Sequence, residues 1–503
     1  MVARKTPAAG ASTGAVAGAA AVDVIPTALT DQIPPLQGIR TRTFFVVKAR
    51  LDADAMKRGL DTLIREHWRK LGGRIMLNKS TSLQEYHVPK TFPPADTYDL
   101  FLWSTETKTG PIDADAPQLM QTPPVESSEG GGGIAFLPPV TDYDPKFRPA
   151  SWPYDVDHGT NDTPILLVHL TQYEDATVVA LSVPHAVADQ LGTSLLVRAW
   201  MGVVAGQAPP PLLEQDPLPQ SREFSSLTKA EQRPQKGKMH VFYTGEYPVV
   251  LLGFFPDLIF NSEETKRIMF LPMATVKALR ARSSKALNAS GGDPGITDND
   301  VITAVMTKLS RIHKGPVTMN LSQTVNLRGR LPQLTGPAMD GFLHNGLSHA
   351  STRFRLDRNT PLAQIAKDNH SCVEEMRDPA HVDIHLAIIR EMARRKQNMH
   401  ICEPFETSFS VTSWSAAWRG LDFSAAVATS ATTSADDSGA KTPLPPPEVF
   451  VIGRSGLLTT PHRFHATVMF RSDAGYWIDI GFSTKNFAAM KAHLAHDPKL
   501  EKL

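Results

Sequence analysis

The feature that most constrains the fold is a pair of apolar, β-rich runs, Ile165–Tyr173 and Thr177–Pro184, separated by three residues. Val, Leu, Ile and Thr dominate both runs, and the short gap between them predicts two buried strands joined as a hairpin. A largely apolar segment, Gly192–Gln207, follows closely and predicts a helix. A buried hairpin followed by a buried helix predicts an α/β fold in which helices cover a sheet.

Strand and helix patterns alternate again in the second half of the chain. Thr297 precedes an apolar helical pattern and is followed three residues later by Asp300, which predicts a capped helix. The proline-rich segment Ala208–Gln220 predicts a linker between two similar lobes, each a mixed β-sheet flanked by helices. The expected division is a tail at residues 1–22, an N-terminal lobe at 23–220, a linker or crossover at 221–262 and a C-terminal lobe at 263–503, with a low-complexity insertion at 425–447.

The charge balance and the thiol content narrow the classes of function. The chain has 52 Lys and Arg residues against 51 Asp and Glu residues, so no basic excess indicates a nucleic-acid partner. Two cysteines, Cys372 and Cys402, are too few for a disulfide framework and fit a reducing compartment, so a cytoplasmic location is expected. The best apolar run, Val249–Phe260, contains Pro256 and is shorter than the roughly 18–20 residues that cross a bilayer. We therefore expect no membrane span.

Two segments have compositions that favour disorder. Residues 1–22 are rich in Ala, Gly, Ser and Thr, with Arg4, Lys5 and no acidic residue. A disordered tail is the favoured interpretation, and an organelle-targeting peptide is the alternative. The insertion at 425–447 is rich in Ala, Ser, Thr and Pro, so it predicts an exposed loop.

A histidine and an aspartate follow the second apolar run directly. His185 comes after Pro184, and Asp189 lies four residues further on. The neutral form of an imidazole with a pKa near 6.5 can accept a proton at cellular pH, and strand ends commonly carry reactive groups. An HxxxD spacing by itself also occurs by chance, so this pair alone leaves a structural and a catalytic interpretation open.

Other candidate sites lack the residues that their chemistry needs. His381 and His385 have the spacing of a helical metal site, but no HExxH glutamate accompanies them, so a solvated helix face is predicted. His462 and His465 predict polarity at a strand edge. The glycine run at 130–133 lacks the Lys-Ser/Thr of a P-loop, and the chain contains no GxSxG motif. We expect no metal.

Three further motifs accompany the HxxxD spacing in a consistent order. They are Asn326-x-Arg328-x-Arg330, Thr412-Ser413-Trp414, and Asp422-Phe423 followed by Ser424. With these motifs the chain resembles the BAHD-type acyl-CoA-dependent acyltransferases from about Val24 to its C-terminus, and it is most similar to divergent fungal members such as trichothecene acetyltransferases. In that family a glycine occupies the position of Ser424.

The resemblance implies a fold and a reaction. The fold is chloramphenicol-acetyltransferase-like, with the active-site tunnel at the interface of two lobes. Acyl-CoA enters as a co-substrate from one face, and an alcohol or amine of a small molecule enters from the other. The acyl group is acetyl or longer, no cofactor is bound permanently, the enzyme is a monomer, and the reaction belongs to secondary metabolism.

The resemblance also assigns roles to residues. His185 is the general base, and the Thr412 hydroxyl or the Trp414 indole N–H stabilises the oxyanion. Asp189 is structural and forms an ion pair with Arg328, and Asp422 belongs to a structural motif. The CoA-contacting residues remain unassigned.

Two alternatives stay open. A nonribosomal-peptide condensation enzyme belongs to the same superfamily, although Pro184 and Gln190 replace the first histidine and the glycine of its motif. The second alternative is a relative that binds a ligand without catalysing transfer.

Overall fold

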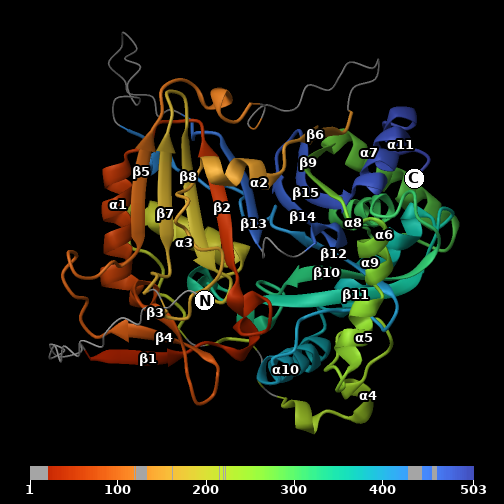
Figure 1. The fold of residues 1–503 in the computed structure, drawn as a ribbon, viewed down its shortest axis with the longest axis horizontal. Helices are drawn as coiled ribbons and strands as arrows, with labels where there is room; N and C mark the ends of the chain where they lie inside the picture. Colours follow the sequence, from red (N-terminus) through yellow and green to blue (C-terminus); the bar gives the residue numbers. More distant parts are fainter. Residues whose placement is uncertain are drawn as a thin grey trace, which may run out of the picture.

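A computed structural model shows three β-sheets with helices packed against them (Figure 1). In this view the five-stranded sheet lies on the left and the seven-stranded sheet on the right. The α/β class predicted from the sequence is confirmed. The structure describes residues 21–117, 119, 133–160, 162–214, 216–218, 220, 222–428, 445–455 and 461–503.

The predicted hairpin lies inside the five-stranded sheet, where β7 and β8 pair antiparallel. The helix predicted after it is α3, which packs against α1 on one face of this sheet. The indole nitrogen of Trp200 on α3 donates to the carbonyl of Met56 on α1 at 2.8 Å. The strands, in sheet order, are β13 (Val449–Ser455), β2 (Arg40–Val47), β8 (Thr177–Pro184), β7 (Leu167–Gln172) and β5 (Leu102–Thr107).

The seven-stranded sheet combines parallel and antiparallel pairs. β10 and β14 each run parallel to β12, and the other pairs are antiparallel. The strands, in sheet order, are β11 (Leu347–Leu356), β10 (Val317–Asn326), β12 (Thr407–Ser413), β14 (His465–Arg471), β15 (Gly475–Ser483), β9 (Glu264–Pro272) and β6 (Ala135–Leu137).

A three-stranded sheet, eleven α-helices and several short 3₁₀ or π-helical turns complete the regular structure of the described residues. The small sheet has the order β1 (Val22–Pro26), β4 (Gln84–Pro89), β3 (Arg74–Leu77). The helices are α1 (Ala53–Thr62), α2 (Val140–Tyr143), α3 (Gln190–Val204), α4 (Lys229–Gln232), α5 (Glu246–Leu252), α6 (Phe255–Phe260), α7 (Met273–Ala289), α8 (Asp298–Leu309), α9 (Leu362–Glu375), α10 (Pro379–Arg394) and α11 (Thr484–His496). None of these helices is both long and apolar enough to cross a bilayer.

The cap predicted at Thr297 is present at the start of α8. The Asp300 backbone N–H donates to the Thr297 hydroxyl at 3.3 Å, and the Thr297 backbone N–H donates to the Asp300 carboxylate at 2.8 Å. This reciprocal arrangement satisfies donors that a helix start otherwise leaves unpaired. It also fixes Asp300 at the edge of a basin described below.

Each half of the chain contributes a strand to the sheet of the other half. β6, from the predicted N-terminal lobe, pairs with β9, and β13, from the predicted C-terminal lobe, pairs with β2. One edge of each sheet is therefore formed by a strand from the other half of the chain, which a division at residues 220 and 263 does not anticipate. Local patterns predict strands, whereas the pairing of an edge strand is decided by tertiary packing.

The predicted insertion begins in packed structure. Ala426 is 1% exposed, Val427 forms a β-bridge with Leu51, and Ala428 donates to the carbonyl of Arg50 at 3.0 Å. The expectation of an exposed loop is therefore wrong for these first residues, because they pack beside the start of α1. Residues 429–444 of the insertion and residues 1–20 of the predicted tail lie outside the described ranges.

Candidate active site

His185 lies in the turn that connects β8 to α3. Its backbone N–H donates to the carbonyl of Ile39 at 2.9 Å, and the Val187 N–H closes the turn on the carbonyl of Pro184 at 2.9 Å. The side chain is partly exposed and lines a cavity of about 370 Å³. Two hydrogen-bonded strands and a capped helix therefore hold this imidazole at the wall of a cavity.

The floor of the cavity is one face of the seven-stranded sheet. Thr324 pairs with His349 between β10 and β11, and Thr412 pairs with Thr467 between β12 and β14. Because side chains alternate along a strand, every second residue of these strands faces the cavity. The resulting floor is rich in hydroxyl, amide and imidazole groups: Thr324, Asn326, Ser410, Thr412, His465, Thr467 and His349.

The two predicted oxyanion donors line the same cavity as His185. The Thr412 hydroxyl has no hydrogen-bond partner in the part of the chain that the structure describes, so it is free to donate to a ligand. Trp414 is 8% exposed, and its backbone N–H donates to the carbonyl of Val468 at 2.8 Å. The structure thus brings His185 together with Thr412 and Trp414, which lie more than two hundred residues further along the chain.

Asp189 has both carboxylate oxygens engaged and is 3% exposed. One oxygen caps α3 by accepting from the Gly192 N–H at 2.7 Å. The other accepts from Arg328 Nη1 at 2.8 Å and from the Gly346 N–H at 3.1 Å. The ion pair expected between Asp189 and Arg328 is therefore present, and it joins α3 to the segment that connects β10 and β11. With both oxygens occupied, the carboxylate is not placed to take a proton from His185.

A buried polar network behind His185 was missed by sequence reasoning. Asn345 Nδ2 donates to the backbone carbonyl of His185 at 2.9 Å and to Asp31 Oδ1 at 2.7 Å. His344 lies between Asp31, at 2.7 Å from Oδ2, and the ammonium of Lys70, at 2.8 Å. Burial lowers the pKa of Lys70 to about 8. The network fixes the backbone of the histidine turn, and no local pattern links its members because they come from four distant segments.

Asp422 lies outside the lining of the cavity. It is exposed, and its carboxylate accepts from the backbone N–H of Ser424 at 2.8 Å and from the Ser424 hydroxyl at 2.6 Å. The adjacent Phe423 is fully buried against Phe45, with ring centroids 5.9 Å apart. Asp422 therefore lies in a turn next to a buried aromatic ring, and it does not line the cavity of His185.

Two predictions about histidines are wrong. His385 does not face solvent: it is 6% exposed, and its Nε2 accepts from the His349 backbone N–H at 3.2 Å. His462 is not strand-edge polarity, because it is buried with its Nε2 2.9 Å from the buried carboxylate of Asp479. Among the described residues no group of His, Cys, Asp or Glu side chains could hold a metal ion.

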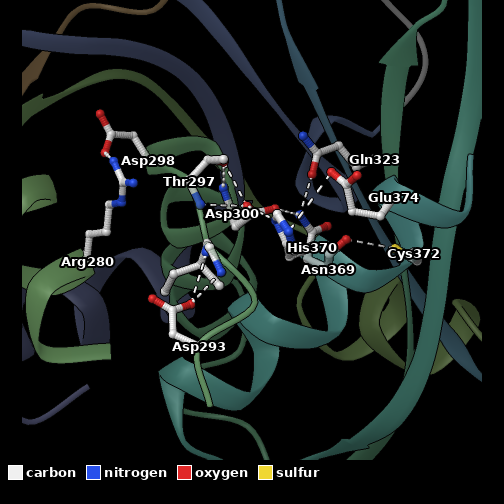
Figure 2. A network of polar contacts seen from close by, with 12 residues as sticks. Arg280, Asp293, Thr297, Asp298, Asp300, Gln323, Asn369, His370, Cys372 and Glu374 are labelled. Atoms are coloured by element: carbon white, nitrogen blue, oxygen red, sulfur yellow. Dashed lines mark hydrogen bonds and ion pairs between the residues drawn. The ribbon is translucent and has the colours of Figure 1, made fainter. Parts of the chain in front are cut away.

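An arginine-rich basin of about 430 Å³ adjoins the cavity of His185 and shares Thr324, Asn326 and Ser413 with it. One wall is the network in Figure 2, where Asn369 Nδ2 donates to Asp300 at 2.7 Å and His370 Nδ1 lies 3.0 Å from the same carboxylate. The cationic side chains that line the basin are Arg280, Arg330, Arg377 and Arg471.

Arg330 differs from its neighbours in the basin. Arg280 and Arg377 contact carboxylates of Asp298 and Glu374, whereas Arg330 Nη1 is buried without a hydrogen-bond partner among the described residues. The guanidinium of Arg330 lines the basin without a carboxylate partner of its own among the described residues, so an anionic ligand there can pair with it. The sequence offered Arg330 as part of a motif without a role, and the structure places its side chain in the lining of the basin.

Similar proteins share both the sequence and the fold. Residues 143–425, more than half of the chain, match the Transferase family. The acetyltransferase adrJ of Penicillium rubens is 26% identical over 418 residues, which are 78% of this chain and 80% of that protein. The Fusarium sporotrichioides protein TRI101, solved in complex with coenzyme A and T-2, has a TM-score of 0.61 at 14% identity over 93% of this chain and 97% of its own. Vinorine synthase has a TM-score of 0.54 at 15% identity over 97% of this chain and 95% of its own.

These likenesses confirm the family that the motifs predicted. The order of motifs, the sheets and the match over residues 143–425 agree with one another. The chain therefore belongs to the Transferase family of BAHD-type acyltransferases and is an enzyme that transfers acyl groups other than amino-acyl groups.

Proposed function

We propose that the protein transfers an acetyl or longer acyl group from acyl-CoA to an alcohol or amine of a small molecule, with His185 as general base. The observation that carries this proposal is the cavity in which His185, Thr412 and Trp414 meet beside an arginine-rich basin. The names of similar proteins support it, because adrJ is an acetyltransferase and the structure of TRI101 contains coenzyme A together with T-2. A monomer in the cytoplasm, acting in secondary metabolism, completes the proposal.

The reaction needs only groups that the cavity supplies. Neutral His185 accepts the proton of the acceptor hydroxyl or amine while its oxygen or nitrogen attacks the thioester carbon. The oxyanion that forms accepts a hydrogen bond from the Thr412 hydroxyl or the Trp414 indole N–H. Collapse of the intermediate breaks the carbon–sulfur bond, and His185 returns its proton to the CoA thiolate. Asn345 Nδ2 donates to the backbone carbonyl of His185 at 2.9 Å and so holds the turn that carries the base.

The experiment that tests the proposal is release of CoA thiol from acetyl-CoA in the presence of a panel of alcohols and amines. We expect at least one acceptor to raise thiol release above the rate of hydrolysis and to be recovered as its ester or amide. If every acceptor leaves thiol release at the rate of hydrolysis, the proposed function is wrong.

The pH dependence follows from the pKa of His185. Burial lowers this pKa below its ordinary value of 6.5, and the charges of Asp189 and Asp31 offset part of the shift. The neutral base is then present from a lower pH upward, so kcat/KM should rise with pH along a limb centred below 6.5 and stay level through neutrality. A pH–rate profile between about pH 5 and pH 8 measures the limb. A limb centred above 6.5 would contradict the assignment.

Arg330 is the arginine of the basin that we expect to hold a CoA phosphate. The Arg330 side chain lines the basin, and its guanidinium can donate to a phosphate oxygen, a charge-assisted bond that arginine forms well. Arg330→Gln should raise the Kd for CoA about tenfold, which corresponds to ~1.4 kcal/mol. Calorimetric titration with CoA measures the change. The control is Arg395→Gln, whose exposed ion pair with Glu391 lies outside the basin; equal effects of both changes would contradict the placement of CoA.

A further inference from the structure

A second cavity of about 370 Å³ lies beyond the site and is lined by residues of the edge strand β11 and helix α10, among others. Both elements are labelled in Figure 1. His349 lines both this cavity and the cavity of His185. Leu347 and Ser351 lie two residues before and two residues after His349 on the same face of β11. Leu347 lines the cavity of His185, and Ser351 lines the second cavity. The sheet face that forms the floor of the site therefore continues past His349 into the second cavity. The arginine-rich basin meets the site at other residues, Thr324 and Asn326 among them.

His349 presents a neutral imidazole at this boundary. Burial and the nearby His185 lower its pKa to about 4, and burial lowers the pKa of His385 behind it to about 3. The His349 side chain makes no hydrogen bond with the described residues, and its Nδ1 is enclosed. Nε2 is thus the ring atom through which His349 can reach a ligand. A hydrogen-bonding group that stays unpaired is costly, so a ligand with a polar group at this point is favoured.

The remaining walls combine apolar side chains with the polar Ser351 and Gln235 and with a charged rim. Met239, Met376, Ile384 and Ile388 supply thioether and aliphatic surface, which packs well against a compact carbon skeleton. At the rim Lys238 is paired with Glu375 at 2.5 Å, so this lysine is already neutralised. The cavity thus offers apolar packing together with a neutral imidazole at the boundary with the site.

We propose that the cavity between β11 and α10 holds the part of the acceptor remote from the reacting group, and that His349 is a specificity-determining residue that hydrogen-bonds a second oxygen function of that acceptor. The substrate class is an alcohol or amine with a compact apolar skeleton and an additional hydroxyl, ether or carbonyl oxygen. This inference rests on the proposed function. A hydrocarbon acyl chain is the less suitable occupant, because it leaves His349 unpaired and the basin for CoA meets the site elsewhere.

A single thiol in the cavity tests occupancy directly. Ile384→Cys places a thiol on the partly exposed wall of the cavity, while Cys372 and Cys402 are buried with pKa values raised to about 12 and should not react. Benzyl methanethiosulfonate labels the new thiol, and a decalin diol serves as the acceptor probe. By mass action, the diol at roughly ten times its Kd should slow labelling about tenfold. Ethanol at the same concentration should not slow it.

The outcomes separate the inference from the proposed function. Slower labelling in the presence of the diol supports the inference. Slower labelling with decanoyl-CoA but not with the diol would place an acyl chain in the cavity and would overturn the inference. Labelling that neither compound slows would also overturn it. Thiol release from acetyl-CoA is measured in the same preparation. Hydrolysis should continue after labelling while transfer to the diol is lost and returns with dithiothreitol. If the proposed function were wrong, the diol would still slow labelling of the thiol, but no acceptor would raise the release of CoA thiol.

The role of His349 is tested by its effect on KM. His349→Leu should raise KM for the decalin diol about tenfold more than KM for the corresponding decalin mono-alcohol, since ~1.4 kcal/mol of binding is lost with the hydrogen bond. His349→Gln, which keeps a donor and an acceptor, should restore most of the difference. Ile384→Leu is the matched control for packing in the same cavity. Equal changes for the diol and the mono-alcohol in His349→Leu would overturn the assignment.

Discussion

Replacement of His185 by alanine should lower kcat/KM for acyl transfer by about 10²–10⁴-fold, the usual contribution of a general base. The fold should survive, because the contacts that hold the turn are made by its backbone, which donates to Ile39 and accepts from Asn345. Thiol release from acetyl-CoA with an acceptor measures the rate, and a thermal melt checks the fold.

The control for this result is the Kd for CoA of the same variant. His185→Ala should bind CoA with the Kd of the parent, since the basin that we assign to CoA is lined by other residues. A variant that keeps more than half of the parent turnover would show that His185 is not the base.

Arg328→Ala should destabilise the protein by about 3–5 kcal/mol, because it leaves the buried charge of Asp189 without its partner. The two side chains are 9% and 3% exposed, and Arg328 also donates to the carbonyls of His344 and Phe342. The loss should appear as a lower melting temperature. Asp189→Asn should have the same direction and a smaller size, because an amide oxygen can still cap α3.

An exposed ion pair provides the control for this change. Arg394 contacts Glu223 at 3.0 Å, and both side chains are largely exposed, so Arg394→Ala should cost less than about 1 kcal/mol. If Arg328→Ala or Asp189→Asn melted like the parent and yet lost activity, the pair would have a direct catalytic role, which would contradict the structural role proposed here.

Local patterns in the sequence predict much of the fold and the chemistry of the site. The hairpin of β7 and β8 follows from two short β-rich runs, and the capping box of α8 follows from Thr297 and Asp300. These features depend on neighbouring residues, so the sequence shows them directly. The motifs of the family added the pairing of Asp189 with Arg328, which no spacing along the chain indicates.

Long-range packing decides the features that sequence reasoning missed. The network of Asp31, Lys70 and His344 joins segments that lie far apart in the chain, and each residue alone reads as a surface charge. His385 has the spacing of a solvated helix face, yet it is buried because α10 packs on His349 of β11. The pairing of β13 with β2 likewise joins segments about four hundred residues apart, so it depends on tertiary packing and not on a local pattern.

In the proposed reaction the acyl group passes directly from CoA to the acceptor in the cavity of His185. The most direct measurement is a single turnover with acetyl-CoA labelled in its acetyl carbonyl, with excess enzyme and an acceptor that stimulates thiol release. The proposed reaction predicts that labelled acceptor forms in step with free CoA thiol, that no label remains on the protein, and that His185→Ala forms neither product. Label retained on the protein, or released only as acetate while the acceptor stays unlabelled, would contradict it.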